Sequence, residues 1–336
     1  MCAEDRRLSI RTNQRLRYRP AAHRDLAECL TLLPPWLGID ESMARALSAL
    51  WPQLLEEPSM ISAVLEDVAA PAAQRVQGWG VTMILPRAFT QALSMHDRPA
   101  AFLTRRVYRA LLDDEFALMS DREIGAASAR GDLDMFIMHF SLRGHDLLQP
   151  QAQRTMAMAN DAFRTFHDGY NPQAIYYETS AGNEPFSMAS GFERLQFRDE
   201  ASLAALLPEQ RPALFGLTRA GALKRMPGPP ARNAFEHQAP LFGFSASQRR
   251  LLWFALFDDS DEALMGPLDV SIHGLKKLWR GIYERIEDRM PEFFGEEASG
   301  DEGRRGPEKR RQVLAYVRQR PEELRPWQPE DEGPRR

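Results

Sequence analysis

The sequence predicts an α+β N-terminal domain followed by an all-α C-terminal helical domain. From Leu16 to about Gln196, apolar runs typical of strands are separated by stretches with helical spacing. Residues 244–290 contain three consecutive helical patterns instead. Strands that alternate with helices indicate a layered sheet. The length of 336 residues is sufficient for two such domains.

The predicted elements of the N-terminal domain follow one another at short intervals. The strands are expected at 15–19, 60–68, 75–85, 133–142, 174–179 and 212–218, and the helices at 23–33, 41–56, 100–112, 150–167 and 184–190. The segment LDMFIMHFSL (133–142) is almost wholly apolar, as expected of a strand covered on both faces. Pro52 predicts a break or kink in the second helix.

Composition shifts along the chain predict seven segments. These are a frayed N-terminus at 1–14, the α/β domain at 15–225, a Pro/Gly-rich linker at 226–243, the helical domain at 244–290, a charged mobile loop at 291–306, a C-terminal helix at 307–325 and a frayed tail at 326–336.

Charge and cysteine content exclude several classes of protein. The net charge is −4 and the pI is about 6.0, so any contact with nucleic acid needs a local basic face. Cys2 and Cys29 offer neither a disulfide framework nor a Cys-based zinc site. The sequence has no signal peptide and no apolar run of roughly 18 residues. We therefore expect a cytoplasmic protein that does not contact a membrane.

The three helical patterns of the C-terminal domain begin at serines suited to capping. Ser245 precedes the first helix, Ser260 (or the adjacent Asp261) the second, and Ser271 the third. Apolar residues at three- and four-residue spacing form the expected core: Leu251, Leu252, Ala255, Leu256, Leu264, Leu268, Leu275, Trp279, Ile282 and Ile286. The residues that point outward from the third helix are His273, Lys276, Lys277 and Arg280.

These residues resemble the DNA-binding helix-turn-helix of LuxR/GerE-type transcriptional regulators. The pattern of that family matches 244–286 without a gap, at Phe244-Ser245, Leu251-Leu252, Ser260 to Met265, Val270-Ser271, Leu275-Lys276 and Ile282-Tyr283. The resemblance implies that Lys276 contacts DNA, that Lys277 is the variable reading position and that Arg280 contacts the backbone of the DNA.

Some residues depart from this family. Asp258 replaces a glycine, Gly266-Pro267 replaces helix-forming residues, and 244–290 contains seven Lys/Arg against eight Asp/Glu. The run 304–311 (RRGPEKRR) could add positive charge by folding back onto DNA. The predicted DNA-binding residues are therefore Ser271, His273, Lys276, Lys277, Arg280, Arg304, Arg305, Lys309 and Arg310.

The order of elements over 15–197 resembles the GNAT acetyltransferase fold, in phrases such as RPAAHRDLAECL and ASGFERL. That family holds the pyrophosphate of acetyl-CoA in a glycine-rich loop after its fourth strand, at the start of a helix. The corresponding loop, 143–153, has only Gly144 and carries the acidic Asp146. We therefore expect no cofactor, with acetyl-CoA possible only if the binding loop is rebuilt.

Catalytic candidates are few. Glu66 and His139 could act as bases and Tyr177 as an acid, but each has a plausible structural role, so we assign no catalytic residue. Trp79 could cover a pocket or fill the core. No spacing of histidines suggests a metal site.

The sequence thus favours a DNA-binding transcriptional regulator with a degenerate GNAT-like domain that senses a small-molecule effector or mediates homodimerisation. The expected partners are DNA, that effector and a second copy of the chain. Two alternatives stay open. One is an acyl-CoA-dependent N-acyltransferase with an accessory helical domain, and the other is a non-enzymatic interaction module.

Overall fold

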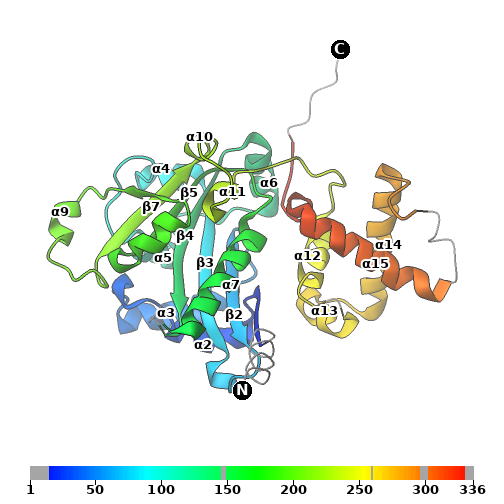
Figure 1. Cartoon of the computed structure of the whole chain (residues 1–336), viewed down its shortest axis with the longest axis horizontal. Helices are drawn as coiled ribbons and strands as arrows, with labels where there is room; N and C mark the ends of the chain where they lie inside the picture. Colours follow the sequence, from blue (N-terminus) through cyan, green and yellow to red (C-terminus); the bar gives the residue numbers. More distant parts are fainter. Residues whose placement is uncertain (1–14, 145–148, 259, 296–301, 330–336) are drawn as a thin grey trace, which may run out of the picture.

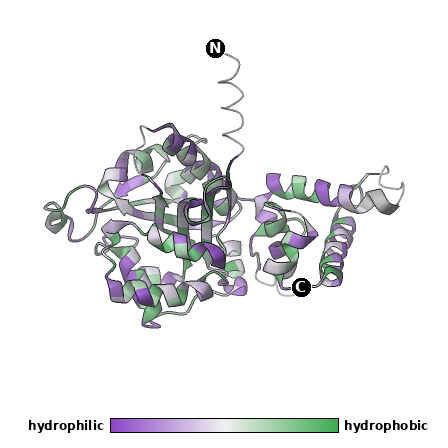
Figure 2. Ribbon diagram, turned by 90° about the horizontal axis from the view of Figure 1, so that it is seen from below, coloured by the Kyte–Doolittle hydropathy of each residue, from purple (hydrophilic) through white to green (hydrophobic). Residues whose placement is uncertain are grey.

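The computed structural model describes residues 15–144, 149–258, 260–295 and 302–329, without the side chains of 302–305. The described chain forms an α/β unit and a smaller helical unit beside it (Figure 1). Seen at right angles in Figure 2, the two units remain separate lobes, and hydrophilic and hydrophobic residues alternate along the helices of both. None of the described helices combines the length and the apolar character needed to cross a bilayer.

The α/β unit is built on a seven-stranded mixed sheet, which confirms the expected α+β class for this part of the chain. The strand order is β1-β2-β3-β4-β5-β7-β6. The strands are β1 (Leu16–Pro20), β2 (Met60–Asp67), β3 (Val76–Leu85), β4 (Leu133–Leu142), β5 (Pro172–Ser180), β6 (Glu193–Leu195) and β7 (Pro212–Thr218). Neighbouring strands pair antiparallel except β4 and β5, which are parallel.

A register shift between β3 and β4, in the centre of the sheet, changes the faces to which successive side chains of β4 point. Val81 pairs with His139 and Thr82 with Ile137, so Met138 is an extra residue opposite β3. Such a bulge breaks the two-residue alternation of side chains. The mostly apolar sequence of β4 fits this arrangement, because both faces of the strand are covered.

One face of the sheet is covered by helices from the first half of the chain. They are α2 (Leu26–Thr31), α3 (Glu41–Leu54), α4 (Arg87–Ala92), α5 (Leu103–Leu112) and the later α9 (Glu200–Leu203). Their apolar residues form one core with Trp79, Phe136 and Met138 of the sheet. Trp79 is fully buried and donates from Nε1 to Ser62 Oγ at 3.0 Å, so it fills the core.

The opposite face is covered by α6 (Asp121–Arg130), α7 (Pro150–His167), α8 (Glu184–Ala189), α10 (Arg219–Ala222) and α11 (Pro230–Asn233). The long α7 crosses the sheet in front of β2 and β3 (Figure 1). Its buried Phe166 packs in a second core with Ile137 and Tyr177. Helix α11 lies inside the predicted linker, yet its Ala231 is fully buried in this core.

The helical unit contains α12 (Ala246–Ala255), α13 (Asp261–Leu268), α14 (Ile272–Arg289) and α15 (Glu302–Gln319). The three expected serine caps are present: Ser245, Ser260 and Ser271 each accept a backbone N–H three residues ahead. The predicted apolar residues of the first three helices form a separate core together with α15. Helix α15 begins within the stretch expected to be a loop.

The two units meet through aromatic and charged side chains. Phe166 of α7 lies edge-on to Trp253 of α12, with ring centroids 4.8 Å apart. The buried Arg325 donates to the carbonyl oxygens of Thr165 and Asp168 and lies over the rings of Tyr170 and Trp253.

Residues 326–329, expected to be frayed, contact the α/β unit, since Trp327 stacks on His237 and the Gln328 amide donates to the carbonyl oxygen of Gly125. The expected frayed ends at 1–14 and 330–336 lie outside the described residues.

Candidate active site

The parallel strands β4 and β5 separate part-way along their length. Their pairing extends from Leu133 opposite Pro172 to Ile137 opposite Tyr177 and stops there. Beyond this point β4 still pairs with β3 as far as Leu142, and β5 with β7 as far as Ser180. A gap therefore opens between two strands that are each held from their outer side. Backbone groups along such a gap are available to other partners.

On the face covered by α5, the first turn of that helix closes the gap. The hydroxyl of Thr104 donates to the carbonyl oxygen of Met138, the extra residue of the bulge, at 2.7 Å. The backbone amides of Leu103 and Thr104 donate to the two carboxylate oxygens of Glu178 at 2.8 and 2.7 Å. The start of α5 thus bonds both strands at the point where they diverge.

The chain is strained where it enters this turn. Phe102, immediately before α5, has a φ of 60° in the left-handed region, which is rare for an aromatic residue. The guanidinium of Arg105 lies 4.4 Å above the Phe102 ring. Residues in such conformations cost on the order of 1–3 kcal/mol and are held by their surroundings. The hydrogen bonds to Glu178 are the contacts that hold this turn in place.

Glu178 is a fully buried carboxyl group in an apolar strand. Burial raises the pKa of Glu178 to about 7, against the lowering effect of the hydrogen bonds from Thr104 and Leu103. A carboxyl group that exchanges its proton near neutral pH is suited to general acid–base chemistry. Each carboxylate oxygen also has a second lone pair beyond the one that its backbone amide occupies.

On the opposite face, the gap borders an apolar cavity of about 90 Å³. Phe140 of β4 and Tyr177 of β5 line it from the diverging strands, while Ala159 and Phe163 come from α7 and Phe186 from α8. The polar groups in its wall include the buried His167 and Thr82, whose Nε2 and Oγ1 atoms lie 2.9 Å apart. The site is thus closed on the α5 face and hollow on the α7 face.

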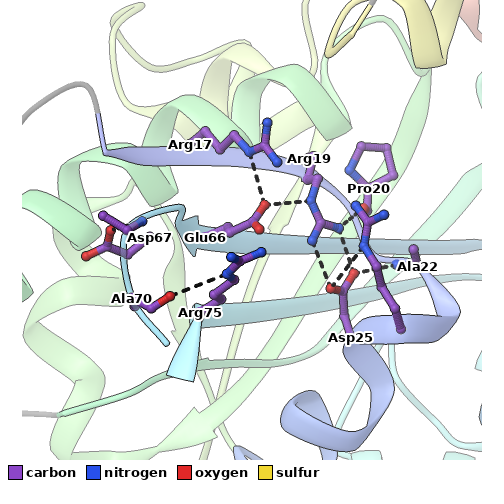
Figure 3. Close-up of polar contacts among 11 residues, drawn as sticks. Arg17, Arg19, Pro20, Ala22, Asp25, Glu66, Asp67, Ala70 and Arg75 are labelled. Atoms are coloured by element: carbon purple, nitrogen blue, oxygen red, sulfur yellow. Dashed lines mark hydrogen bonds and ion pairs between the residues drawn. The ribbon is translucent and has the colours of Figure 1, made fainter. Parts of the chain in front are cut away.

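The predicted base Glu66 lies elsewhere, in an ion-pair network between β1 and β2 (Figure 3). Its Oε2 accepts from Arg17 at 3.0 Å and from Arg19 at 2.8 Å, and Arg19 also pairs with Asp25. Burial raises the pKa of Glu66, but the hydrogen bonds and charges of the two arginines outweigh it and leave its pKa below the usual value. The structure thus gives Glu66 a role in joining β1 to β2.

The other two candidates lie near the gap on opposite faces. His139 is fully buried beside Trp79, its Nε2 lies 3.2 Å from the hydroxyl of Tyr108, and burial lowers its pKa to about 3. It is therefore a neutral core residue. Tyr177 lines the cavity, and burial raises its pKa to about 12, so its phenol keeps its proton.

The loop expected to hold a pyrophosphate is described only at its ends. Arg143 donates to the Val76 carbonyl oxygen and pairs with Glu28 at 3.0 Å, so it is engaged with β3 and α2. Gly144 has a φ of 85°, and a Cβ atom placed there would have nothing within 4 Å. Asp146 lies outside the described residues.

The cations predicted to read DNA fall into two groups. His273, Lys276, Lys277 and Arg280 are exposed on α14, and the three Lys/Arg side chains form no hydrogen bond or ion pair within the described part of the chain. Ser271 is the N-cap of this helix, accepting from the Gly274 amide at 3.2 Å.

Two of the predicted cations of α15, Lys309 and Arg310, pack inward against the helical unit. Lys309 pairs with Glu287 at 2.6 Å and lies over the Phe294 ring, while Arg310 pairs with Asp261 and lies over Trp279. The side chains of the predicted Arg304 and Arg305 lie outside the described residues.

Sequence reasoning predicted the helix at 100–112 that contains α5, but it missed Glu178 and the contact of Glu178 with that helix. The available signal was a single carboxylate within the apolar run AIYYETS, a residue type that is rarely buried without a partner. Its partners, however, are backbone amides 74 and 75 positions earlier in the chain. Nothing in the local pattern around Leu103 indicates that contact. Among the described residues, no group of three His, Cys, Asp or Glu side chains could hold a metal ion.

Comparisons with known proteins match only part of the chain. No family model and no curated protein matches it. Among solved structures, it is similar to Arabidopsis thaliana NAA60 in complex with acetyl-CoA, at 14% identity over 61% of this chain and 99% of that one, with a TM-score of 0.33. An acetyltransferase from Thermus thermophilus has 11% identity over 60% of this chain and 96% of its own, with a TM-score of 0.32.

A dodecameric spermidine N-acetyltransferase from Vibrio cholerae gives 13% identity over 63% of this chain and 98% of that chain, with a TM-score of 0.34. Likenesses of this degree decide neither fold nor activity. The inferences below therefore depend on the strands, the gap and the side chains of this chain alone.

Proposed function

We propose that the α/β unit transfers an acyl group from a CoA thioester to an amine, with Glu178 as the base. The observation that carries this proposal is the position of Glu178. It is a buried carboxyl group with a pKa near 7, at the point where two parallel strands part, and it already accepts two N–H groups. A regulator that only senses a ligand needs no such group.

The proposed reaction is a direct transfer. The amine nitrogen attacks the thioester carbonyl carbon, the C–S bond breaks, and an amide and free CoA result. Glu178 takes the proton that the attacking nitrogen loses and returns it through solvent to the departing thiolate sulfur, so charge and atoms balance. The thioester approaches from the α7 face, which is hollow, and the amine from the α5 face, where Glu178 points toward Leu103 and Thr104.

In this proposal the first turn of α5 occupies the place of the acceptor amine. The backbone amides of Leu103 and Thr104 donate to Glu178 as an amine N–H would. Transfer therefore requires this turn to move, and the strained φ of Phe102 favours its release. We assign no described residue of the loop 143–153 to binding of the pyrophosphate. The proposal depends on the gap between β4 and β5 and on the cavity beside it.

A thiol-release assay tests this proposal. The full chain is mixed with acetyl-CoA or butyryl-CoA and a primary amine, with spermidine and a peptide with a free N-terminus as the probes. We expect release of CoA that depends on the amine, and a loss of at least about 100-fold in kcat for Glu178→Gln with the KM for the thioester unchanged. Absence of amine-dependent release from the folded wild-type chain would overturn the proposal.

A second candidate function, DNA binding by the helical unit, is supported by the exposed face of α14. Lys276, Lys277 and Arg280 are all exposed on one helix that starts at a serine cap. A helix with cations of this kind fits a major groove, as the LuxR/GerE resemblance implies. A mobility-shift titration of the full chain on duplex DNA tests it. We expect retardation that weakens as salt rises, and equal mobility at every protein concentration would exclude it.

A further inference from the structure

We propose that the acyl group is a short chain of about four carbons, held in the apolar cavity under α7. This inference rests on the proposed function and adds its substrate class. Protein interiors are close-packed, and voids larger than a water molecule are few. We therefore expect a cavity of about 90 Å³, on the opposite face of the sheet from the Glu178 carboxyl group, to hold a ligand.

The lining of the cavity indicates an apolar occupant. Ala159, Ala162 and Phe163 of α7 line one side. Apolar residues of β2 and β3 line the other, together with Phe140 and Tyr177 of the diverging strands. Water is stable in a cavity only with two to four polar partners, whereas apolar cavities stay dry and accept apolar molecules. The buried polar pair in the wall, His167 and Thr82, satisfies itself through its mutual hydrogen bond and leaves little for water.

The cavity lies where an acyl chain would extend from a thioester in the gap. Tyr177 lines the cavity, and the next residue, Glu178, faces α5, because successive side chains of a strand point to opposite faces. A carbonyl carbon placed between the strands would thus have the base on one face and the cavity on the other. The chain attached to that carbon can enter the cavity while the amine approaches from the opposite side.

The volume of the cavity limits the length of the chain. A cavity of about 150 Å³ holds benzene, which has six carbons, so the 90 Å³ cavity has room for about four. An acetyl group would fill only part of it, and an octanoyl group would exceed it. Each methylene transferred from water into an apolar site increases affinity by roughly fourfold. Butyryl-CoA has two more methylenes than acetyl-CoA and should therefore bind about fifteenfold more tightly.

Isothermal titration of the full chain with CoA, acetyl-CoA, butyryl-CoA and octanoyl-CoA tests this inference. We expect the tightest binding for butyryl-CoA, by about fifteenfold over acetyl-CoA, and weaker binding for octanoyl-CoA. The variant Ala159→Leu fills the cavity from α7 and should remove the preference for butyryl-CoA while CoA still binds. Ala157→Leu, the same change on the exposed side of the same helix, should keep the preference.

The outcomes separate this inference from the proposed function. Equal affinity for acetyl-CoA and butyryl-CoA overturns the inference alone, as does a preference that survives in a folded Ala159→Leu variant. No binding of CoA or of any thioester overturns both. If Ala159→Leu does not fold, as judged by its thermal transition, the chain-length series on the wild-type protein decides the matter without it.

Discussion

The Oε2 atom of Glu178 lies 2.7 Å from the backbone nitrogen of Thr104, so a buried carboxyl group of β5 holds the first turn of α5. The Thr104 hydroxyl also bonds the Met138 carbonyl oxygen of β4. These contacts connect two strands that no longer pair with each other to a helix that precedes both. Thr104 therefore contacts both strands at the point where they diverge.

The first prediction concerns stability. Glu178→Gln replaces one carboxylate oxygen by an NH₂ group, which cannot accept from the amide of Leu103 or Thr104. An unpaired buried donor costs about 1–3 kcal/mol, so the free energy of unfolding should fall by that amount. Urea denaturation measures it. Glu115→Gln, on an exposed residue, should change it by no more than about 0.5 kcal/mol. Equal stability of the two variants would contradict the role given to Glu178.

The second prediction concerns pH. The pKa of Glu178 is raised by burial to about 7 in the folded chain from an ordinary value of 4.5, so the folded state binds more protons between these values. The contribution of this group to stability is complete below pH 4.5 and is lost as pH rises through about 7. The stability of the wild type relative to Glu178→Gln should therefore decline from pH 5 to pH 8 in urea titrations. If the difference in stability between the wild type and Glu178→Gln stayed constant from pH 5 to pH 8, Glu178 would be ionised throughout this range.

Much of the fold follows from local patterns in the sequence. The bounds of β4 and α7 match the predicted ranges 133–142 and 150–167, because a continuous apolar run and a helix-spaced run are both local features. The serine caps Ser245, Ser260 and Ser271 were predicted for the same reason.

The features that define the candidate site are not local. The bulge at Met138 is visible only in the pairing with β3, and the gap only in the pairing with β5. Glu66 was a plausible base by sequence, but Arg19, 47 positions away, pairs with it on the neighbouring strand. Contacts over such separations depend on the register between strands, which the sequence of one strand does not specify.

The third prediction concerns the wall of the cavity. Thr82→Val keeps the shape of the side chain but removes the hydrogen-bond partner of His167 Nε2. We expect a loss of about 1–3 kcal/mol, because a buried polar atom is left without a partner. Chemical denaturation at pH 7 provides the measurement, with Thr31→Val at an exposed position as the control. A loss no larger than that of the control would mean that the His167–Thr82 bond contributes little.

His167 should also make the protein sensitive to acid. Burial lowers the pKa of His167 to about 4 from its ordinary value of 6.5, so the unfolded chain binds more protons between these values. Its contribution to stability is present above pH 6.5 and is lost as pH falls toward 4. The melting temperature of the wild type should drop over this range by more than that of His167→Gln. An equal drop in the melting temperatures of the wild type and His167→Gln between pH 6.5 and pH 4 would contradict this assignment.

The fourth prediction concerns the junction between the units. Arg325 is buried, bonds two carbonyl oxygens of the α/β unit and lies over Trp253 of the helical unit. Arg325→Ala should therefore separate the unfolding of the two units into two calorimetric transitions. Arg289→Ala, at the exposed end of α14, should leave the profile of the wild type unchanged. A single transition in Arg325→Ala would show that other contacts couple the units.

The fifth prediction distinguishes the two groups of cations in the helical unit. If the unit binds DNA, the double variant Lys276→Ala/Lys277→Ala should reduce the dependence of log K on log salt by about two. Lys309→Ala should leave that dependence unchanged and lower thermal stability instead, because Lys309 pairs with Glu287 and packs on Phe294. If Lys309→Ala lowered the salt dependence and the double variant left it unchanged, the DNA contact would be assigned to α15.

A crystal structure of the full chain grown with butyryl-CoA would show directly whether the thioester binds in the gap. We expect density for the thioester between β4 and β5, with the acyl chain among Phe140, Phe163 and Tyr177 and the carbonyl carbon on the Glu178 side. Density for the ligand at any other surface, with the cavity under α7 empty at a saturating concentration, would contradict this expectation.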